Sequence, residues 1–124
     1  MMRTKSIMTY DVGDIVLVPF PFTNLLSSKK RPAVVISQKT YQYKRPDIIL
    51  MAITSQIKMP LGYGECILSQ WQQAGLPKLS MLKPLIATID QKNILKKLGA
   101  LTALDQKSLF EVMSNLFDST SGGK

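Results

Sequence analysis

The chain of 124 residues contains no histidine and only one cysteine, Cys66. The absence of histidine excludes an imidazole general base, a Ser-His-Asp or Cys-His nucleophile and every histidine metal site. A single cysteine excludes an intramolecular disulfide and a cysteine zinc cluster, and we expect Cys66 to be a small core residue. The chemistry of any site must therefore come from Arg, Lys, Ser, Thr, Tyr or carboxylate side chains.

Long apolar runs are also missing. No stretch reaches the ~20 apolar residues that span a bilayer. Asp11 and Asp14 interrupt the segment that would have to be apolar in a signal peptide. We therefore predict a cytoplasmic protein that does not bind a membrane. A chain of this length is typical of one domain, which we place at residues 11–118, with flexible termini at 1–10 and 119–124.

Acidic residues are few. Eight Asp and Glu stand against 16 Lys and Arg, which gives a net charge of +8 and an isoelectric point near 9.8. A basic excess this large in a short chain favours a polyanionic partner, although solubility alone would also account for it. The carboxylates are scattered along the sequence, so we predict no metal site and no cofactor.

Short apolar runs separated by polar breaks with Gly or Pro predict a small, mainly β domain. The strands are expected at 14–22, 31–37, 47–54, 65–68 and 79–89, and the basic segment 38–46 is expected to be a loop. Because Pro19 and Pro21 cannot donate to a ladder, the first strand should lie at a sheet edge, bend or pair loosely. Segment 94–101 fits either a short strand or a turn of helix.

The last element is expected to be an amphipathic helix laid over the sheet. Thr102 is a good N-cap residue, and Asp105 follows three positions later. Apolar side chains then recur at a helical spacing. They are Leu109, Val112, Met113, Leu116 and Phe117.

A hairpin register places two polar side chains together. If 31–37 and 47–54 pair as antiparallel strands with Ser37 near Asp47, Arg31 lies opposite or beside Thr54. An arginine can grip a phosphate through two N–H groups, and a threonine hydroxyl can donate to it. The alternative is an ordinary exposed Arg at a strand start with a Thr at a favourable strand position.

Four blocks of sequence resemble, in order and spacing, the MazF/PemK family of type II toxin–antitoxin toxins. They are GDIVLVPFPF, KKRPAVVIS, DIILMAITSQI and GLPKLSMLKPLIATIDQKNILKKLGALT, and with the final helix they cover residues 13 to about 117. The resemblance implies a small SH3-like β-barrel with a C-terminal helix and a homodimer whose interface groove takes single-stranded RNA. It also implies a metal-independent, sequence-selective endoribonuclease that cleaves mRNA and is neutralised by a cognate antitoxin.

The same resemblance assigns roles to residues. The family's catalytic arginine falls on Arg31 and its catalytic threonine on Thr54, with Gln56 as an RNA contact. A cut by the RNA's own 2′-OH needs no water nucleophile, and these side chains can stabilise the charge that develops on the phosphate. The residue that takes the 2′-OH proton stays open. Basic residues expected to line the RNA groove are Lys29, Lys30, Lys58 and Lys83.

The sequence departs from the family pattern in its fifth strand. Ala87 stands where many members have Lys or Arg, and Pro84 where they often have a carboxylate. Lys83, four residues before Ala87, lies on the same face of a regular strand and can substitute. Two alternatives therefore stay open: a protein-binding toxin of the same fold, like the gyrase poison CcdB, and an inactive RNA-binding SH3-like module.

Other residues have simpler interpretations. Trp71 is expected to pack against the core rather than stack on a base. Tyr41 and Tyr43, in a basic segment, fit base stacking and simple packing equally well. The remaining assignments concern lysines expected on a solvated face and methionines expected in the core. They are Lys92, Lys96 and Lys97, and Met51, Met81 and Met113.

Overall fold

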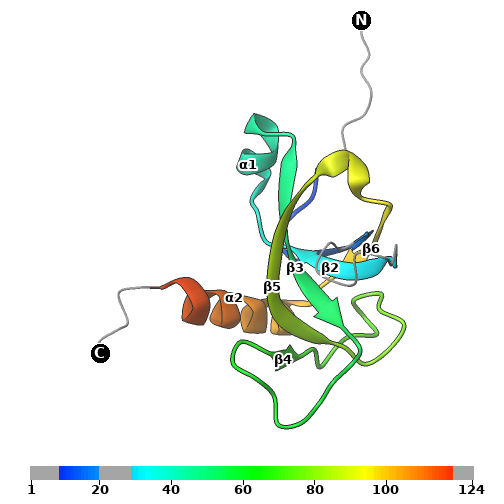
Figure 1. Ribbon diagram of the computed structural model, residues 1–124, viewed down its shortest axis with the longest axis vertical. Coiled ribbons are helices and arrows are strands. Elements are labelled where there is room, and N and C mark those ends of the chain that lie inside the picture. Colours follow the sequence, from blue (N-terminus) through cyan, green and yellow to red (C-terminus); the bar gives the residue numbers. More distant parts are fainter. Residues whose placement is uncertain (1–8, 20–28, 119–124) are drawn as a thin grey trace, which may run out of the picture.

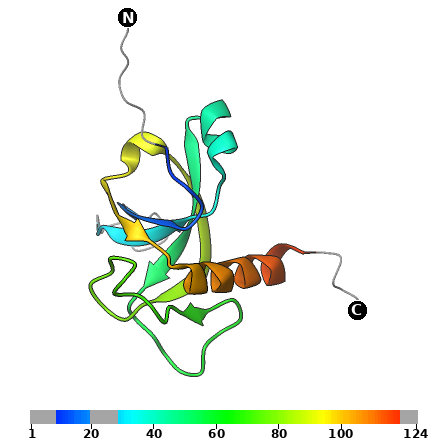
Figure 2. The same ribbon diagram turned by 180° about the vertical axis from the view of Figure 1, so that it is seen from behind.

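The computed structural model describes residues 9–19 and 29–118. Six antiparallel strands form one curled sheet, a half-barrel with the order β4-β5-β3-β2-β1-β6, and a long helix lies across it (Figures 1 and 2). The expected mainly β class with a C-terminal helix is therefore confirmed. The elements are β1 (Asp14–Val18), β2 (Arg31–Val35), α1 (Lys39–Lys44), β3 (Asp47–Thr54), β4 (Cys66–Ile67), β5 (Met81–Asp90), the 3₁₀ turn η1 (Gln91–Asn93), β6 (Lys96–Ala100) and α2 (Ala103–Phe117).

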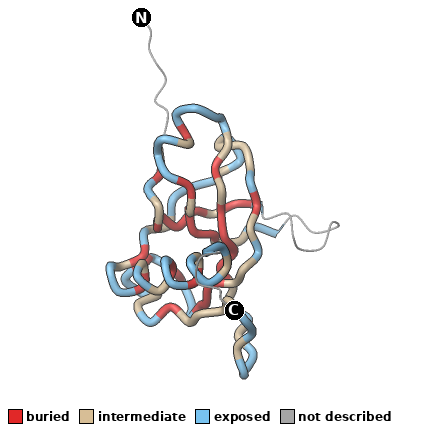
Figure 3. The backbone as a smooth tube through the Cα atoms, turned by 90° about the vertical axis from the view of Figure 1, so that its left-hand side faces the viewer, coloured by how far each residue is buried: buried red, intermediate tan, exposed pale blue. Residues whose placement is uncertain are grey.

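Buried residues are concentrated in the central strands (Figure 3), and they form one apolar cluster on each face of the sheet. On β3, Met51 and Ile53 face the core beneath α2, whereas Leu50 and Ala52 join the core on the other face. Alternate residues of a strand point to opposite faces. A strand covered on both faces is therefore apolar throughout, which explains the unbroken run of β3. The bounds predicted for this strand are those observed.

The final helix is confirmed with one correction. Thr102 is the N-cap of α2 and its hydroxyl oxygen accepts the Asp105 N–H. Leu109 and Val112 are buried against the sheet. Phe117, which the apolar spacing assigned to the same face, has 63% of its surface exposed. It lies in the last turn, beyond the part of the sheet that the helix covers.

The first strand is not at an edge of the sheet. β1 pairs with β2 on one side and β6 on the other, so the edge alternative is wrong. The pairing with β6 has a register shift between Ile15 and Val16, which agrees with the alternative of a bent strand. The strand ends at Val18, directly before Pro19. Pro21 and the rest of the predicted strand lie outside the described residues. A proline after the last ladder position costs no strand hydrogen bond.

Segment 38–46 was predicted as a loop and contains the helix α1. A distant contact holds it in place: the Gln42 side chain donates to the Tyr10 carbonyl at 2.7 Å and accepts the Tyr10 N–H at 2.9 Å. The Tyr41 hydroxyl donates to Asp47 at 3.2 Å. Isolated helices this short are marginal, so tertiary contacts decide the conformation. Tyr10, one residue before the expected domain boundary, is buried.

The ambiguous segment 94–101 contains β6, which pairs with β1. The backbone of the turn 69–75 lies very close to this strand at Ala74 and Gly75. A Cβ on Gly75, whose φ is +89°, would meet the Leu98 carbonyl, and a Cβ on Gly99 would meet the Ala74 carbonyl. Only glycine allows so close an approach. The backbone at residues 74 and 75 therefore packs directly on the backbone of β6.

The remaining packing predictions agree with the structure. Trp71 packs against the core beneath α2, and the methionines expected in the core, Met51, Met81 and Met113, are buried or partly buried. Cys66 is a partly buried core residue with a free thiol, and burial raises the pKa of that thiol. Among residues 9–19 and 29–118, no helix is long and apolar enough to cross a membrane.

Candidate nucleic-acid interface

The site is built on the adjacent ends of β2 and β3. Ala33 pairs with Ala52, one residue away from the predicted register. Continuing that register by two residues sets Arg31 opposite Thr54, so the predicted neighbourhood of these two side chains is confirmed. Both side chains line one cavity of about 210 Å³.

This cavity, called here the Arg31 cavity, is basic and rich in hydroxyl groups. Its described lining contains no carboxylate. The Nε of Arg31 is buried and makes no hydrogen bond with the described residues. Such a buried donor is costly unless a ligand accepts from it. The lining residues are Lys30, Arg31, Pro32, Ile53, Thr54, Ser55, Pro77, Lys78 and Ser80.

A second cavity of about 160 Å³, called here the Glu65 cavity, adjoins the first through Thr54, which lines both. The Thr54 hydroxyl oxygen accepts the Gln56 N–H at 3.1 Å. Its hydroxyl hydrogen is therefore left to donate to a ligand. The lining residues are Thr54, Gln56, Lys58, Glu65, Met81 and Lys83.

A bulge in β5 brings Lys83 into this cavity. Leu50 of β3 pairs with Ala87 of β5, and Ala52 pairs with Lys83. The two β3 residues are two positions apart, whereas their β5 partners are four positions apart. The extra residues of β5 include Pro84, which cannot donate to the ladder. Because an even number is inserted, Lys83 and Ala87 keep the same face of the sheet, as predicted.

The structure thus brings six of the seven predicted site residues to two adjoining cavities. The exception is Lys29, which is exposed beside Lys30 but lines neither cavity. Whether these residues bind or cleave RNA stays a prediction.

Sequence reasoning missed the contributions of Lys78, Ser80 and Glu65. Lys78 and Ser80 come from the segment that follows the turn 69–75. Buried Asp105 on α2 holds the start of that turn, because its carboxylate accepts the Ser69 N–H at 3.1 Å and the Gln70 N–H at 2.8 Å. Lys78 lies in the block GLPKLSMLKPLIATIDQKNILKKLGALT that resembles the toxin family, so its sequence position was a usable signal. The position of Glu65 in the predicted strand 65–68 gave no such signal.

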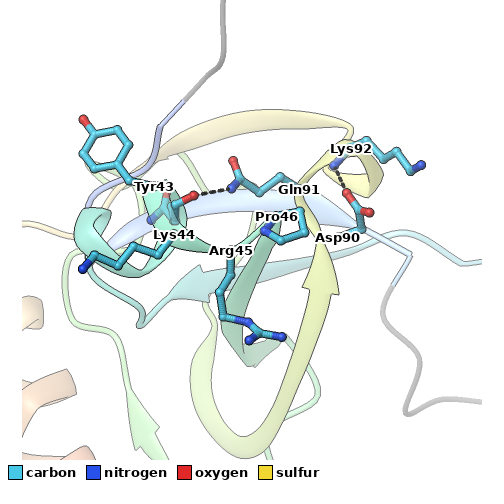
Figure 4. A pocket seen from close by; sticks show the side chains of 8 residues that line it. Tyr43, Lys44, Arg45, Pro46, Asp90, Gln91 and Lys92 are labelled. Carbon is cyan, nitrogen blue, oxygen red and sulfur yellow. Dashed lines mark hydrogen bonds between the residues drawn. The ribbon is translucent and has the colours of Figure 1, made fainter.

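A larger cavity of about 480 Å³ lies at the opposite end of β3, between α1 and η1 (Figure 4). Its charged side chains diverge: Lys44 and Arg45 point away from Lys92. Arg45 donates to Asp47 at 3.2 Å, and this contact raises the Arg45 pKa. The cationic side chains of this cavity therefore do not point toward one common position.

The tyrosines near this cavity differ from one another. The Tyr41 hydroxyl is bound to Asp47, which favours its packing interpretation. Tyr43 is 72% exposed, and both of its interpretations stay open. Of the three lysines expected on a solvated face, Lys97 contacts buried Asp14 at 3.3 Å. Within the described segments, no group of three Cys, Asp or Glu side chains is placed to hold a metal ion.

The sequence of this chain matches one known protein family. The family of PemK-like, MazF-like toxins of type II toxin–antitoxin systems matches residues 11–117. No curated protein sequence matches the chain.

Solved structures show a similar fold. MazF bound to MazE from Deinococcus radiodurans is 19% identical, with a TM-score of 0.67 over 89% of this chain and 96% of that one. The Mycobacterium tuberculosis toxin MazF-mt6 is 19% identical, with a TM-score of 0.66 over 85% and 96%. A mycobacterial endoribonuclease in complex with its cognate antitoxin is 10% identical, with a TM-score of 0.69 over 86% and 92%.

Proposed function

Because the chain belongs to the PemK-like, MazF-like toxins of type II toxin–antitoxin systems, we propose that it is an endoribonuclease that cleaves single-stranded mRNA in the cytoplasm. The observation that carries the proposal is the Arg31 cavity. There an arginine and a threonine face each other at adjoining strand ends, with two lysines and no carboxylate in the described lining. A solved structure of similar fold is described as an endoribonuclease.

The proposed reaction uses the RNA's own 2′-OH. The 2′-OH gives up its proton as its oxygen attacks the adjacent phosphorus, the bond from phosphorus to the 5′ oxygen breaks, and the leaving 5′ oxygen takes up a proton, so that no proton is consumed overall. The products are a 2′,3′-cyclic phosphate and a 5′-OH end. Arg31 stabilises the extra negative charge on the phosphoryl oxygens, and the Thr54 hydroxyl donates to one of them. No metal ion is needed for these steps.

The rival functions lack this support. A protein-binding toxin like CcdB has no need for Arg31 and Thr54 in one cavity. An inactive RNA-binding module was suggested by Ala87 and Pro84, but Lys83 supplies a cation on the face of Ala87. The geometry therefore favours the ribonuclease.

The binding of RNA is expected to depend steeply on salt. Five cations line the two cavities: Lys30, Arg31, Lys58, Lys78 and Lys83. For single strands, log K falls by about 0.7 per neutralised phosphate for each unit of log salt, so five contacts give a slope of about −3.5. Fluorescence anisotropy with an RNA that carries 2′-O-methyl groups, and so cannot be cut, measures the slope. A slope shallower than about −1 would instead support a protein target.

We further propose a homodimer and a cognate antitoxin as partners. Relatives of similar fold are described in complex with MazE or with a cognate antitoxin. Two apolar side chains on α2 have no cover within the described chain: Phe110 is 51% and Phe117 63% exposed. They are seven residues apart and therefore lie on one face of the helix. Exposed apolar surface of this kind is typical of a protein interface.

The dimer is expected to form without the antitoxin. Sedimentation equilibrium at micromolar concentration should give twice the 13.8 kDa of the chain. Replacing Phe110 and Phe117 by Ser should shift the mass toward that of one chain if α2 lies in the interface. A wild-type mass of one chain would contradict the dimer.

A further inference from the structure

Glu65 is the one carboxylate in the described linings of the two cavities. It is partly buried, and its Oε1 accepts the Gly62 N–H at 2.6 Å. Its backbone N–H donates in turn to the Gly62 carbonyl at 3.1 Å. The first bond holds the Glu65 side chain against the turn 62–65, and the second closes the backbone of the turn. Within the described chain, the other carboxylate oxygen makes no hydrogen bond.

The turn 62–65 uses only one of the two oxygens of the Glu65 carboxylate. One oxygen is enough to accept from Gly62, and a neutral glutamine could do so. Lys58 and Lys83 line the same cavity, yet neither forms an ion pair with Glu65 in the described structure. A carboxylate also repels the phosphates that the neighbouring cations attract. Its second oxygen is therefore available to accept a hydrogen bond from a ligand group.

In single-stranded RNA, the strongest candidates for such a donor are the amino groups of the bases. Proteins read unstacked bases through hydrogen bonds to their edges, and Glu accepts from the amino group of cytosine. Uracil has no amino group, and its one ring N–H is flanked by two carbonyl oxygens that a carboxylate repels. A volume of about 160 Å³ is below the roughly 300–1,000 Å³ of drug-sized sites, and suits a single base.

We propose that the Glu65 cavity selects an amino-bearing base (adenine, cytosine or guanine) over uracil at a nucleotide next to the scissile phosphate. Gln56 can donate to the base's ring nitrogens or carbonyl groups, and Met81 offers an apolar wall. Thr54, shared by the two cavities, places this base beside the reacting phosphate. The inference rests on the proposed ribonuclease function, because the base is defined by its distance from the cut.

The test is the substitution Glu65→Gln. The glutamine keeps an oxygen that accepts from the Gly62 N–H, and it adds an NH₂ group that can donate a hydrogen bond to a carbonyl oxygen of uracil. Wild-type protein is incubated with a randomised single-stranded RNA pool, and the cut ends are sequenced. We expect uracil to be depleted about tenfold or more at one position flanking the cut, since a good base contact discriminates by about 1–3 kcal/mol. In the variant, that depletion should shrink about tenfold while cutting of the pool continues. Glu111 is exposed on α2 and lines neither cavity. The substitution Glu111→Gln makes the same chemical change there and should leave the cleavage profile unaltered.

Each other outcome has a defined meaning. A folded Glu65→Gln protein with the wild-type profile would overturn the inference and leave the ribonuclease proposal intact. Loss of cutting at every sequence would also overturn it, because Glu65 would then serve the reaction itself. A wild-type protein that cuts no RNA would contradict the proposed function. If the variant misfolds by circular dichroism, Glu65→Asp, which shortens the same carboxylate, should weaken the depletion, and an unchanged profile would overturn the inference.

Discussion

Replacing Arg31 with alanine is expected to slow RNA cleavage by about 10²–10³-fold, the usual cost of losing one preorganised donor to a developing negative charge. The Arg31 Nε is buried without a partner among the described residues, so the wild-type side chain is already placed and needs a ligand oxygen. Single-turnover cleavage of a long RNA measures the rate. Circular dichroism and sedimentation should show an unchanged fold and assembly.

Two further variants distinguish the loss of the Arg31 guanidinium group from the loss of one positive charge. Arg31→Lys keeps a positive charge but loses the planar fork that binds two phosphate oxygens, so its rate should remain well below wild type. Arg45→Ala removes an arginine at the other end of β3, where it is paired with Asp47, and should cut at nearly the wild-type rate. Equal losses in Arg31→Ala and Arg45→Ala would point to net charge rather than to the cavity.

An RNA with one 2′-deoxy nucleotide directly 5′ of the scissile phosphate is expected to resist cleavage at that bond completely. Without the 2′-OH there is no internal nucleophile, and the described part of the lining of the Arg31 cavity includes no carboxylate that would activate water in its place. The same RNA should be cut at other susceptible bonds, which serve as an internal control. Electrophoresis of end-labelled RNA resolves both kinds of product.

The reaction should run at full rate in EDTA and leave a 2′,3′-cyclic phosphate and a 5′-OH. Treatment with a phosphatase that opens cyclic ends, followed by gel mobility, identifies the first group, and labelling by polynucleotide kinase identifies the second. Cutting at the deoxy position, or activity that returns only with added Mg²⁺, would contradict attack by the 2′-OH.

The parts of the fold that depend on local pattern were predictable. β3 is apolar at every buried position of both faces, so its bounds follow from the sequence, and Thr102 marks the start of α2. The observed pairing of β2 with β3 is one residue away from the predicted register, which the number of residues in segment 38–46 does not fix by itself. The site survived this error, since a shift of one residue leaves Arg31 and Thr54 neighbours.

The parts that depend on distant contacts were not predictable. α1 exists because Gln42 binds the backbone of Tyr10, and nothing within 38–46 indicates that contact. β1 became an interior strand because β6, ambiguous by itself, pairs with it. Glu65 and Lys78 reach the cavities from connecting segments, whose paths are set by a turn and by a carboxylate on α2 rather than by periodicity.

The hydrogen bonds from Ser69 and Gln70 to Asp105 also set an order of events during synthesis. The ribosome makes Arg31 and Thr54 early, and their hairpin has all its residues once β3 is complete. The opposite wall, with Lys78 and Ser80, gains its anchor only after residue 105 has left the exit tunnel and α2 has begun to form. A nascent chain therefore carries Arg31 and Thr54 before it carries a finished cavity.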